Sequence, residues 1–317
     1  MRIVTLGGGT GQGQLLRGLA RRGVELTGLV GVTDNGGHSG HLRKVLGIPA
    51  VGDLRGCIAA VAEPGPFGRS LDFRFSAGEL DGASLGNLIL AGLVLSEGSL
   101  TRAAAVLAGR AGASARVLPV SDAASQIAAE MADGRTITGE WEIIRREPRI
   151  TIARLFHDPP LAATAEAIRA ARRADLVVIG PGSLRTALAS ILLTKGLREA
   201  LRKKRVAFIL NILTQPGQTD GLTARDHVEE IAKYLGRPPD AVIANSKRPP
   251  DWAMQDAEFV DPAGIEAVRA NLLEPLRPAD TARRERPSRY PAGPHLVRHD
   301  PAKLARAILR IARRGRR

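Results

Sequence analysis

The sequence predicts an α/β protein with a Rossmann-like, doubly wound and mainly parallel β-sheet, a partly antiparallel β extension and a basic C-terminal tail. Three observations lead to this fold class: short apolar runs recur along the chain, glycine-rich loops follow two of them, and apolar residues at helical spacing come next. Parallel strands need such helical crossovers. With 44% hydrophobic and 25% charged residues, the disordered, collagen-like and disulfide-scaffold classes are excluded.

The first hundred residues predict a βαβ unit followed by helices. Strands are expected at residues 3–6 and 26–32, because both runs are short and apolar. Between them, Leu15, Leu16 and Leu19 have the spacing of one helix face. Mainly helical structure is expected further on, at residues 58–61, 85–95 and 103–107.

A change of pattern predicts the β extension at residues 115–157, inside the main domain. Residues 127–144 have the pattern of a hairpin, because Asp133-Gly134 can supply the two positive φ angles of a type I′ turn. Two more strands are expected in this extension, at residues 116–120 and 150–156.

The second half repeats the opening pattern of strand, glycine-rich loop and helix. A buried strand is expected at residues 176–179, and a helix at 184–201 follows the loop Gly180-Pro181-Gly182-Ser183. Thr223 and Asp226 have capping-box spacing, which places a helix start there and predicts a helix to about residue 235. The remaining expected elements are a helix at 161–173 and strands at 206–212 and 241–244.

The C-terminal residues differ in composition from the rest. We assign residues 1–275 to the Rossmann-type domain and 276–317 to an Arg- and Pro-rich tail. Within the tail, a short amphipathic helix is expected at 303–313, and 277–300 is expected to be poorly ordered. Residues 277–317 hold 13 Lys and Arg against three acidic residues, so most of the net charge of +14 lies there. Because only 3% of residues are aromatic, base-stacking platforms are scarce and nucleic acid is not an expected partner.

Nothing in the sequence indicates a membrane span or export. No apolar run approaches the roughly 18 residues that a span requires, and the start becomes glycine-rich too early for a signal peptide. The single cysteine, Cys57, allows neither an internal disulfide nor a thiolate metal site. We therefore expect a cytoplasmic protein without a membrane span.

Two glycine-rich segments form the main candidate site. Gly7-Gly8-Gly9-Thr10-Gly11 stands between a strand and a helix, where backbone N–H groups can approach a phosphate at the helix N-terminus. Its spacing matches neither the dinucleotide nor the ATPase motif. The candidates after the second strand are Asp34, Asn35, Gly36, Gly37, Ser39, Gly40, Arg43, Asp53 and Arg55. Because parallel strands deliver their following loops to one edge, both segments are expected to face one cleft.

Each charge in this cleft suggests a role. Asp34 and Asp53 could hold a divalent metal or ligand hydroxyls. Arg43 and Arg55 could neutralise a diphosphate, and Ser39 could donate a hydrogen bond to it.

Three later segments add candidates. Ser84 is a possible N-cap, and the amide of Asn87 one turn later could contact a ligand. Gly180, Pro181, Gly182 and Ser183 make a second anion site at a strand end and helix start. Polar residues after the strand at 206–212 indicate ligand recognition, and they are Asn211, Thr214, Gln215, Thr219, Asp220 and His227. No nucleophile and base are arranged in a known catalytic pattern, so no catalytic residue is assigned.

Taken in order, these motifs resemble the CofD-like gluconeogenesis factor family. The matching segments are Gly7 to Gly11, Asp34 to Gly40, Gly52-Asp53, Ser84-Leu85-Gly86-Asn87, Asp133-Gly134, Gly180 to Ser183 and Thr219-Asp220-Gly221. The resemblance covers residues 1 to about 275 and implies a nucleotide-sugar ligand, UDP-N-acetylglucosamine. It also implies a regulatory role in cell shape on gluconeogenic carbon sources. A homo-oligomer is the expected assembly.

Enzymatic relatives in the same family provide the alternative. They transfer 2-phospho-L-lactate from a guanosine diphosphate carrier to a deazaflavin acceptor and use a divalent metal near the aspartate loop. On this alternative the protein is a phosphotransferase, Mg²⁺ is its cofactor, and Asp34 and Asp53 are the metal ligands.

Four positions depart from the family pattern. Asn35 replaces an Asp, His38 a Ser, Ala83 a His and Arg185 a Tyr. One carboxylate fewer is expected to weaken a metal site. The lost aromatic ring and the added cation at Arg185 are expected to favour a different phosphate ligand.

Overall fold

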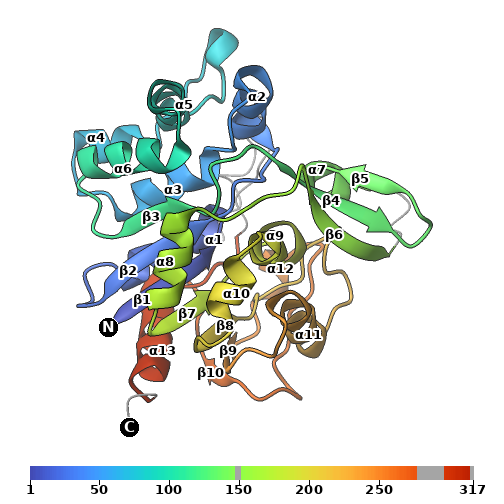
Figure 1. Cartoon of the computed structure of the whole chain (residues 1–317). Coiled ribbons are helices and arrows are strands. Elements are labelled where there is room, and N and C mark those ends of the chain that lie inside the picture. The colour runs from blue at the N-terminus through green and yellow to red at the C-terminus, as the bar shows by residue number, and fades with distance from the viewer. Residues whose placement is uncertain (147–150, 277–295, 315–317) are drawn as a thin grey trace.

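The computed structural model describes residues 1–146, 151–276 and 296–314. At its centre is a parallel sheet of seven strands, in the order β10-β9-β8-β7-β1-β2-β3 (Figure 1). These strands are β1 (Arg2–Gly7), β2 (Glu25–Val30), β3 (Arg116–Pro119), β7 (Leu176–Ile179), β8 (Val206–Ile209), β9 (Ala241–Asn245) and β10 (Val268–Ala270). The strand order reverses between β1 and β7, which confirms the expected doubly wound, Rossmann-like fold.

The apolar runs explain why this sheet is buried on both faces. No residue of β7 or β8 is exposed, as expected for strands that helices cover on both sides. β1 pairs with both neighbours in parallel register, Leu6 opposite Leu29 on one side and opposite Ile179 on the other. The carboxyl ends of β1, β2 and β7 therefore meet at one edge.

Helices form a layer on each face of the sheet. They are α1 (Gly9–Leu19), α2 (Gly37–Leu46), α3 (Gly52–Val61), α4 (Pro66–Ser70), α5 (Leu85–Glu97), α6 (Leu100–Arg110), α7 (Glu140–Ile144), α8 (Ala165–Arg173), α9 (Ser190–Leu193), α10 (Leu197–Leu201), α11 (Ala224–Leu235), α12 (Asp251–Met254) and α13 (Pro301–Arg314), with a 3₁₀ turn at Gly78–Leu80. α1, α3 and α13 pack together on one face, and α8 and α10 pack together on the other (Figure 1). The expected capping box at Thr223 is present. In the described ranges, no helix combines the length and apolar character needed to cross a bilayer.

The β extension is a separate antiparallel sheet in the order β5-β4-β6, beside the main sheet (Figure 1). Its strands are β4 (Gln126–Met131), β5 (Thr136–Thr138) and β6 (Ile152–Asp158). β3 lies within the predicted extension, but it pairs with β2 in the main sheet, so the antiparallel part begins at β4. The hairpin turn has positive φ at Gly134 and not at Asp133, so the predicted type I′ turn is wrong.

Two helices also differ from expectation. The glycine-rich segment after β2 is not a loop throughout, because α2 begins at Gly37. The helix expected at 184–201 is divided into a π-helix at Leu184–Ala189, then α9, then α10. Gly196, with φ near +89°, separates the last two.

The C-terminal helix α13 packs on the main domain. Leu304, Ile308 and Ile311 are buried, and a Cβ on Gly18 of α1 would overlap the carbonyl of Pro301. The expected helix at 303–313 is thus present. Residues 277–295 of the segment expected to be poorly ordered lie outside the described residues. The domain boundary at 275 stays a prediction.

Candidate functional site

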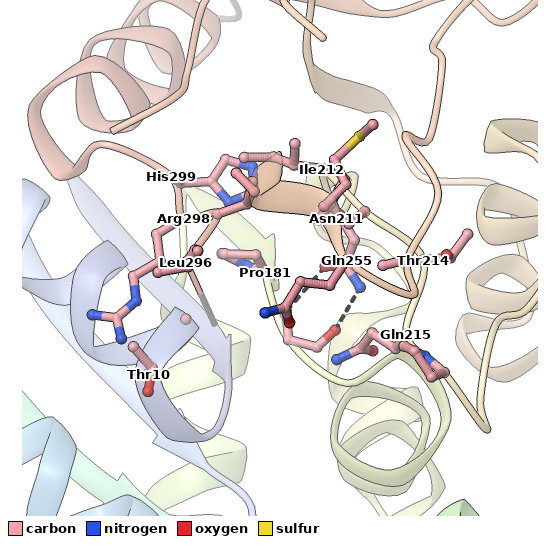
Figure 2. A pocket seen from close by; sticks show the side chains of 18 of the residues that line it. Thr10, Pro181, Asn211, Ile212, Thr214, Gln215, Gln255, Leu296, Arg298 and His299 are labelled. Carbon is pink, nitrogen blue, oxygen red and sulfur yellow. Dashed lines mark hydrogen bonds between the residues drawn. The ribbon is translucent and has the colours of Figure 1, made fainter. Parts of the chain in front are cut away.

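A cavity of about 600 Å³ lies at the carboxyl edge of the main sheet (Figure 2). Segments that follow β1, β7 and β8 line it, together with residues 253–257 and 296–299. Seven of the predicted site residues are in its wall: Thr10, Gly11, Pro181, Gly182, Asn211, Thr214 and Gln215. The cavity therefore lies where the strand order reverses, the usual place for a ligand in this type of sheet.

The sequence did not indicate several residues of the wall. These include Gln14, Arg74, Gln255, Leu296, Arg298 and His299. Residues 296–299 belong to the segment that was expected to be a separate tail. A bridge between Leu273 and His299 joins this segment to the chain that follows β10, and the Glu274 N–H donates to the Arg298 carbonyl at 3.0 Å beside it. No local sequence pattern predicts this pairing.

Asn211 holds the Gly180–Ser183 loop. Its Nδ2 donates to the carbonyl of Gly182 at 2.9 Å, and its Oδ1 accepts from the Gly182 N–H at 3.3 Å (Figure 2). Gln215 Oε1 accepts from the N–H of Leu184 at 3.2 Å, and its Nε2 donates to Ser183 Oγ at 3.4 Å. Side chains that follow β8 thus fix the backbone that follows β7.

Thr219 and Asp220 hold the loop after β8 itself. Thr219 Oγ1 accepts from the Gln215 N–H at 2.7 Å, and Asp220 Oδ2 accepts from the Gly217 N–H at 2.8 Å. Neither residue lines the cavity. Their position fits a role in shaping the loop.

Three carboxylates lie near the first glycine loop. Asp53 sits against that loop, because a Cβ on Gly8 would overlap its Oδ2. Asp34 Oδ1 accepts from the Gly36 N–H at 2.8 Å. Glu140 Oε1 accepts from Thr186 Oγ1 at 2.6 Å. Glu140 was not predicted as a site residue, because the hairpin that leads to it was expected outside the site.

Burial raises the pKa of all three carboxyls, and repulsion by a neighbouring carboxylate adds to the shift of Asp53 and Glu140. Desolvation first, then the charge of Asp34, raises the pKa of Asp53 to about 7 and that of Glu140 to about 8. Burial also raises the pKa of Asp34, although the Gly36 N–H and Arg43 oppose the shift. Among the ion pairs between described residues, none includes these three carboxylates. The ionised forms of these carboxyls are therefore disfavoured, and Glu140 keeps its proton at neutral pH.

The predicted arginines are mostly engaged within the protein. Arg55 forms an ion pair with Asp72, and its Nε donates to Asn87 Oδ1 at 3.1 Å. Arg43 remains near Asp34 and acts on it through space. Arg185 Nε pairs with Glu230 at 3.1 Å, and its Nη1 donates to the Gln218 carbonyl at 2.7 Å. The charge of Arg185 is compensated, which argues against the phosphate role expected for it.

Other predicted residues connect neighbouring segments. Ser39 Oγ accepts from the Gly52 N–H at 3.0 Å, which joins α2 to α3. Ser84 caps α5 through the N–H of Asn87, and its own N–H donates to His38 Nδ1 at 3.3 Å. Gly37, Gly40 and Arg43 lie on α2.

Asn35 faces the β extension and not the carboxylates. Its Oδ1 accepts from the Trp141 N–H at 3.1 Å, and its Nδ2 donates to Glu142 Oε2 at 2.7 Å. Because the side chain is turned toward α7, the replacement of the usual Asp takes no carboxylate away from Asp34 and Asp53. The expected weakening of a metal site therefore has no support at this position.

The fit of a divalent metal depends on Asp34 and Asp53. Within the described residues, no group of three His, Cys, Asp or Glu side chains is arranged to hold an ion. The two carboxyls are nevertheless hard oxygen donors when ionised, and burial, which raises the pKa of both, makes a compensating cation favourable. Mg²⁺ usually binds one or two carboxylates and completes its shell with water and phosphate oxygens. The residues thus fit a Mg²⁺ that enters with a phosphate ligand.

Comparisons with known proteins place the chain in a family. The family model described as 2-phospho-L-lactate transferase CofD matches residues 3–277. The gluconeogenesis factor of Bacillus subtilis is 36% identical over 322 residues, 97% of each chain, and that of Halalkalibacterium halodurans is 41% identical over 242 residues, 74% of each chain. The crystal structure of protein BH3568 from Bacillus halodurans has a TM-score of 0.86 and 33% identity, over 97% of this chain and 99% of that one. The chain therefore belongs to the CofD-like gluconeogenesis factor family.

Proposed function

We propose that the protein binds a UDP-sugar, UDP-N-acetylglucosamine in particular, in the cavity at the carboxyl edge and acts as a regulatory protein of cell shape during growth on gluconeogenic carbon sources. The observation that carries the proposal is the composition of the cavity wall. Glycine-loop backbone forms one side of it and the amide side chains Gln215 and Gln255 belong to the rest. A volume of about 600 Å³ is within the usual range for small-molecule sites.

The diphosphate is assigned to the start of α1. This helix begins at Gly9 after the N-cap Gly8, and the Gly9 N–H already donates to the Asp53 carboxylate. The anion is therefore assigned to the next N–H groups of the first turn, those of Thr10 and Gly11, which line the cavity. Arg298 lines the same cavity, and its side chain points toward Thr10 (Figure 2). A guanidinium opposite helix N–H groups favours a doubly charged diphosphate.

The sugar and base are assigned to the part of the cavity away from α1. Polar groups that follow β8, including Thr214 and Gln215, alternate there with apolar Ile212 and Met254. Such a wall suits a ring that carries hydroxyl and amide groups on one edge and an apolar face. The loop after β7 is held rigidly by Asn211, so the site is preorganised for its ligand.

The transferase reading remains the second candidate, because Asp34 and Asp53 favour it. On that reading, these carboxylates would hold Mg²⁺, which supplies charge neutralisation at a phosphate. The chain's own residues would position the diphosphate at Gly8 to Gly11 and the acceptor in the cavity. Glu140, whose pKa is raised to about 8, would keep a proton beside these carboxylates.

Calorimetric titration with UDP-N-acetylglucosamine tests the proposal. Arg298→Ala is expected to weaken binding about tenfold or more, since a charge-assisted contact is lost. Arg310→Ala is the matched control, because Arg310 is exposed on α13 and outside the cavity wall. A wild-type protein that binds no UDP-sugar would overturn the proposal. Product formed from the guanosine diphosphate carrier and a deazaflavin acceptor would establish the transferase instead.

A further inference from the structure

Helix α7 lies where three loops of the candidate site meet. From the loop after β2, Asn35 uses both ends of its amide on α7, accepting from the Trp141 N–H and donating to the Glu142 carboxylate. From the π-helix after β7, Thr186 Oγ1 donates to Glu140 Oε1 at 2.6 Å. α7 thus contacts the first two loops with three consecutive residues.

The third loop, after β8, contacts the other end of α7. Arg146, two residues beyond the helix, donates from Nη1 to the Ile143 carbonyl at 2.6 Å and to the Gly217 carbonyl at 2.7 Å. The approach is close, because a Cβ on Gly217 would overlap the carbonyl of Ile144. One short helix therefore bridges segments that follow β2, β7 and β8.

Two glycines make the contact with the β2 loop possible. A Cβ on Gly36 would overlap the indole nitrogen of Trp141. Gly139 has φ near +113° and lies directly against the Asn35 amide and the Glu142 carboxylate. Trp141 is covered on one face by the guanidinium of Arg145 at 4.3 Å from its ring centre. The contact is a packed junction and not a single hydrogen bond.

We propose that α7 is a clamp that orders the three site loops as one unit, with Asn35 as its main positioning residue. A helix of five residues has little stability of its own, so α7 depends on its contacts with the loops. The dependence is mutual: loss of the Asn35 contact loosens α7, and a looser α7 releases the β8 loop, which Asn35 does not touch. The β extension, on this proposal, is the support of the ligand site.

The clamp is inferred from contacts within the chain, and it rests on the proposed function only where it names a UDP-sugar as the ligand. When a UDP-sugar binds the loops after β7 and β8, α7 transmits the added order to the aspartate loop that carries Asp34. This coupling runs through hydrogen bonds and packed groups that the chain already contains, in a contiguous path.

Hydrogen exchange of the full chain, read by mass spectrometry, tests the clamp without any ligand. Asn35→Asp places a carboxylate against Glu142 and removes the donor. Exchange is expected to rise about tenfold in residues 33–40 and about threefold in residues 214–221. The double variant Asn35→Asp with Glu142→Gln restores a donor and an acceptor, and is expected to return both regions to the wild-type rates. Asn271→Asp introduces the same negative charge at an exposed position away from α7, and it controls for the general effect of an Asn-to-Asp replacement on exchange.

The outcomes distinguish a clamp that orders all three loops from a contact that orders only the loop after β2. A rise confined to residues 33–40 and 140–146, with 214–221 unchanged, would overturn the proposal. So would a double variant that exchanges as fast as Asn35→Asp. If UDP-N-acetylglucosamine binds the wild type, its affinity should fall about tenfold in Asn35→Asp and recover in the double variant. A wild type that binds no UDP-sugar would refute the proposed function, while the exchange data would still decide on the clamp.

Discussion

At the scale of single residues, the carboxyl group of Glu140 has the most unusual environment in the site. It is held by Thr186 and lies in the field of Asp34 and Asp53, so burial and repulsion raise its pKa to about 8. The unfolded chain would lose this proton near the ordinary value of 4.5. Because the folded state binds the extra proton between these values, the free energy of unfolding falls as the pH rises through them.

Replacement of Glu140 should remove its contribution to the pH dependence of the free energy of unfolding. In Glu140→Gln the hydrogen bond from Thr186 is kept and the titration is removed. Between pH 6.5 and 8 the wild type should lose on the order of 1 kcal/mol of stability relative to this variant, as measured by urea unfolding. In this range the buried His157 and His299 do not interfere, because burial lowers the pKa of both to about 4. Exposed Glu229→Gln is the control, and parallel pH profiles for wild type and Glu140→Gln would contradict the account.

Asn211 provides a second test at this scale. Asn211→Ala removes both hydrogen bonds to Gly182, so we expect a loss of about 1–2 kcal/mol in the free energy of unfolding, together with weaker UDP-sugar binding. Glu229→Ala, at an exposed position outside the cavity wall, should leave both quantities nearly unchanged. Full ligand affinity in Asn211→Ala would show that the Gly180–Ser183 loop needs no such support.

At the scale of elements, α13 decides how far the folded unit extends. Its buried residues face α1 and β9, while Arg306, Arg310 and Arg313 are exposed. The segment before it lines the ligand cavity. A helix in this position supports the first helix of the fold and the cavity wall together.

Shortening a buried side chain of α13 should therefore destabilise the whole domain. Leu304→Ala, at a fully buried position, is expected to cost about 2–4 kcal/mol in a single cooperative unfolding transition. Arg310→Ala on the exposed side should change stability by less than about 0.5 kcal/mol. If Leu304→Ala instead produced an early, separate transition, α13 would be an independent tail, as the boundary at residue 275 supposes.

Local sequence patterns predicted most elements, but not how distant elements pair. The strands at residues 3–6 and 176–179 were visible as apolar runs, and the cap at Thr223 as a polar spacing. By contrast, β3 was assigned to the wrong sheet, because its pairing with β2 depends on a crossover of more than eighty residues that no local pattern records. The expected helix at 184–201 failed because the π-helix is set by contacts of Thr186 with Gln218 and Glu140.

The same reasoning applies to the site. Glycine loops such as Gly7 to Gly11 could be recognised because a phosphate cradle requires them locally. Glu140, Gln255 and Arg298 join the site only through tertiary folding, and each lies in a segment without a recognisable motif. Asn35 was recognised as a candidate from its glycine-rich segment, but the sequence did not indicate its contacts with α7.

At the scale of the whole molecule, the cleft is built from segments that span nearly the entire chain. Residues 10–11 and 296–299 line it together, and α7 contacts the loops that follow β2 and β8. A ligand that fills this cleft binds the folded state alone, so it must stabilise the protein as a whole. The expected homo-oligomer and the cytoplasmic location stay predictions.

Thermal unfolding with UDP-N-acetylglucosamine and with GDP, each with and without Mg²⁺, tests the central claim most directly. Ligand at 100 times its Kd adds about 2.7 kcal/mol of stability, a shift that is easily measured. We predict a clear rise in Tm with UDP-N-acetylglucosamine, also without Mg²⁺, and a smaller one with GDP. No stabilisation by the UDP-sugar, or a preference for GDP that requires Mg²⁺, would contradict a UDP-sugar-binding regulatory protein.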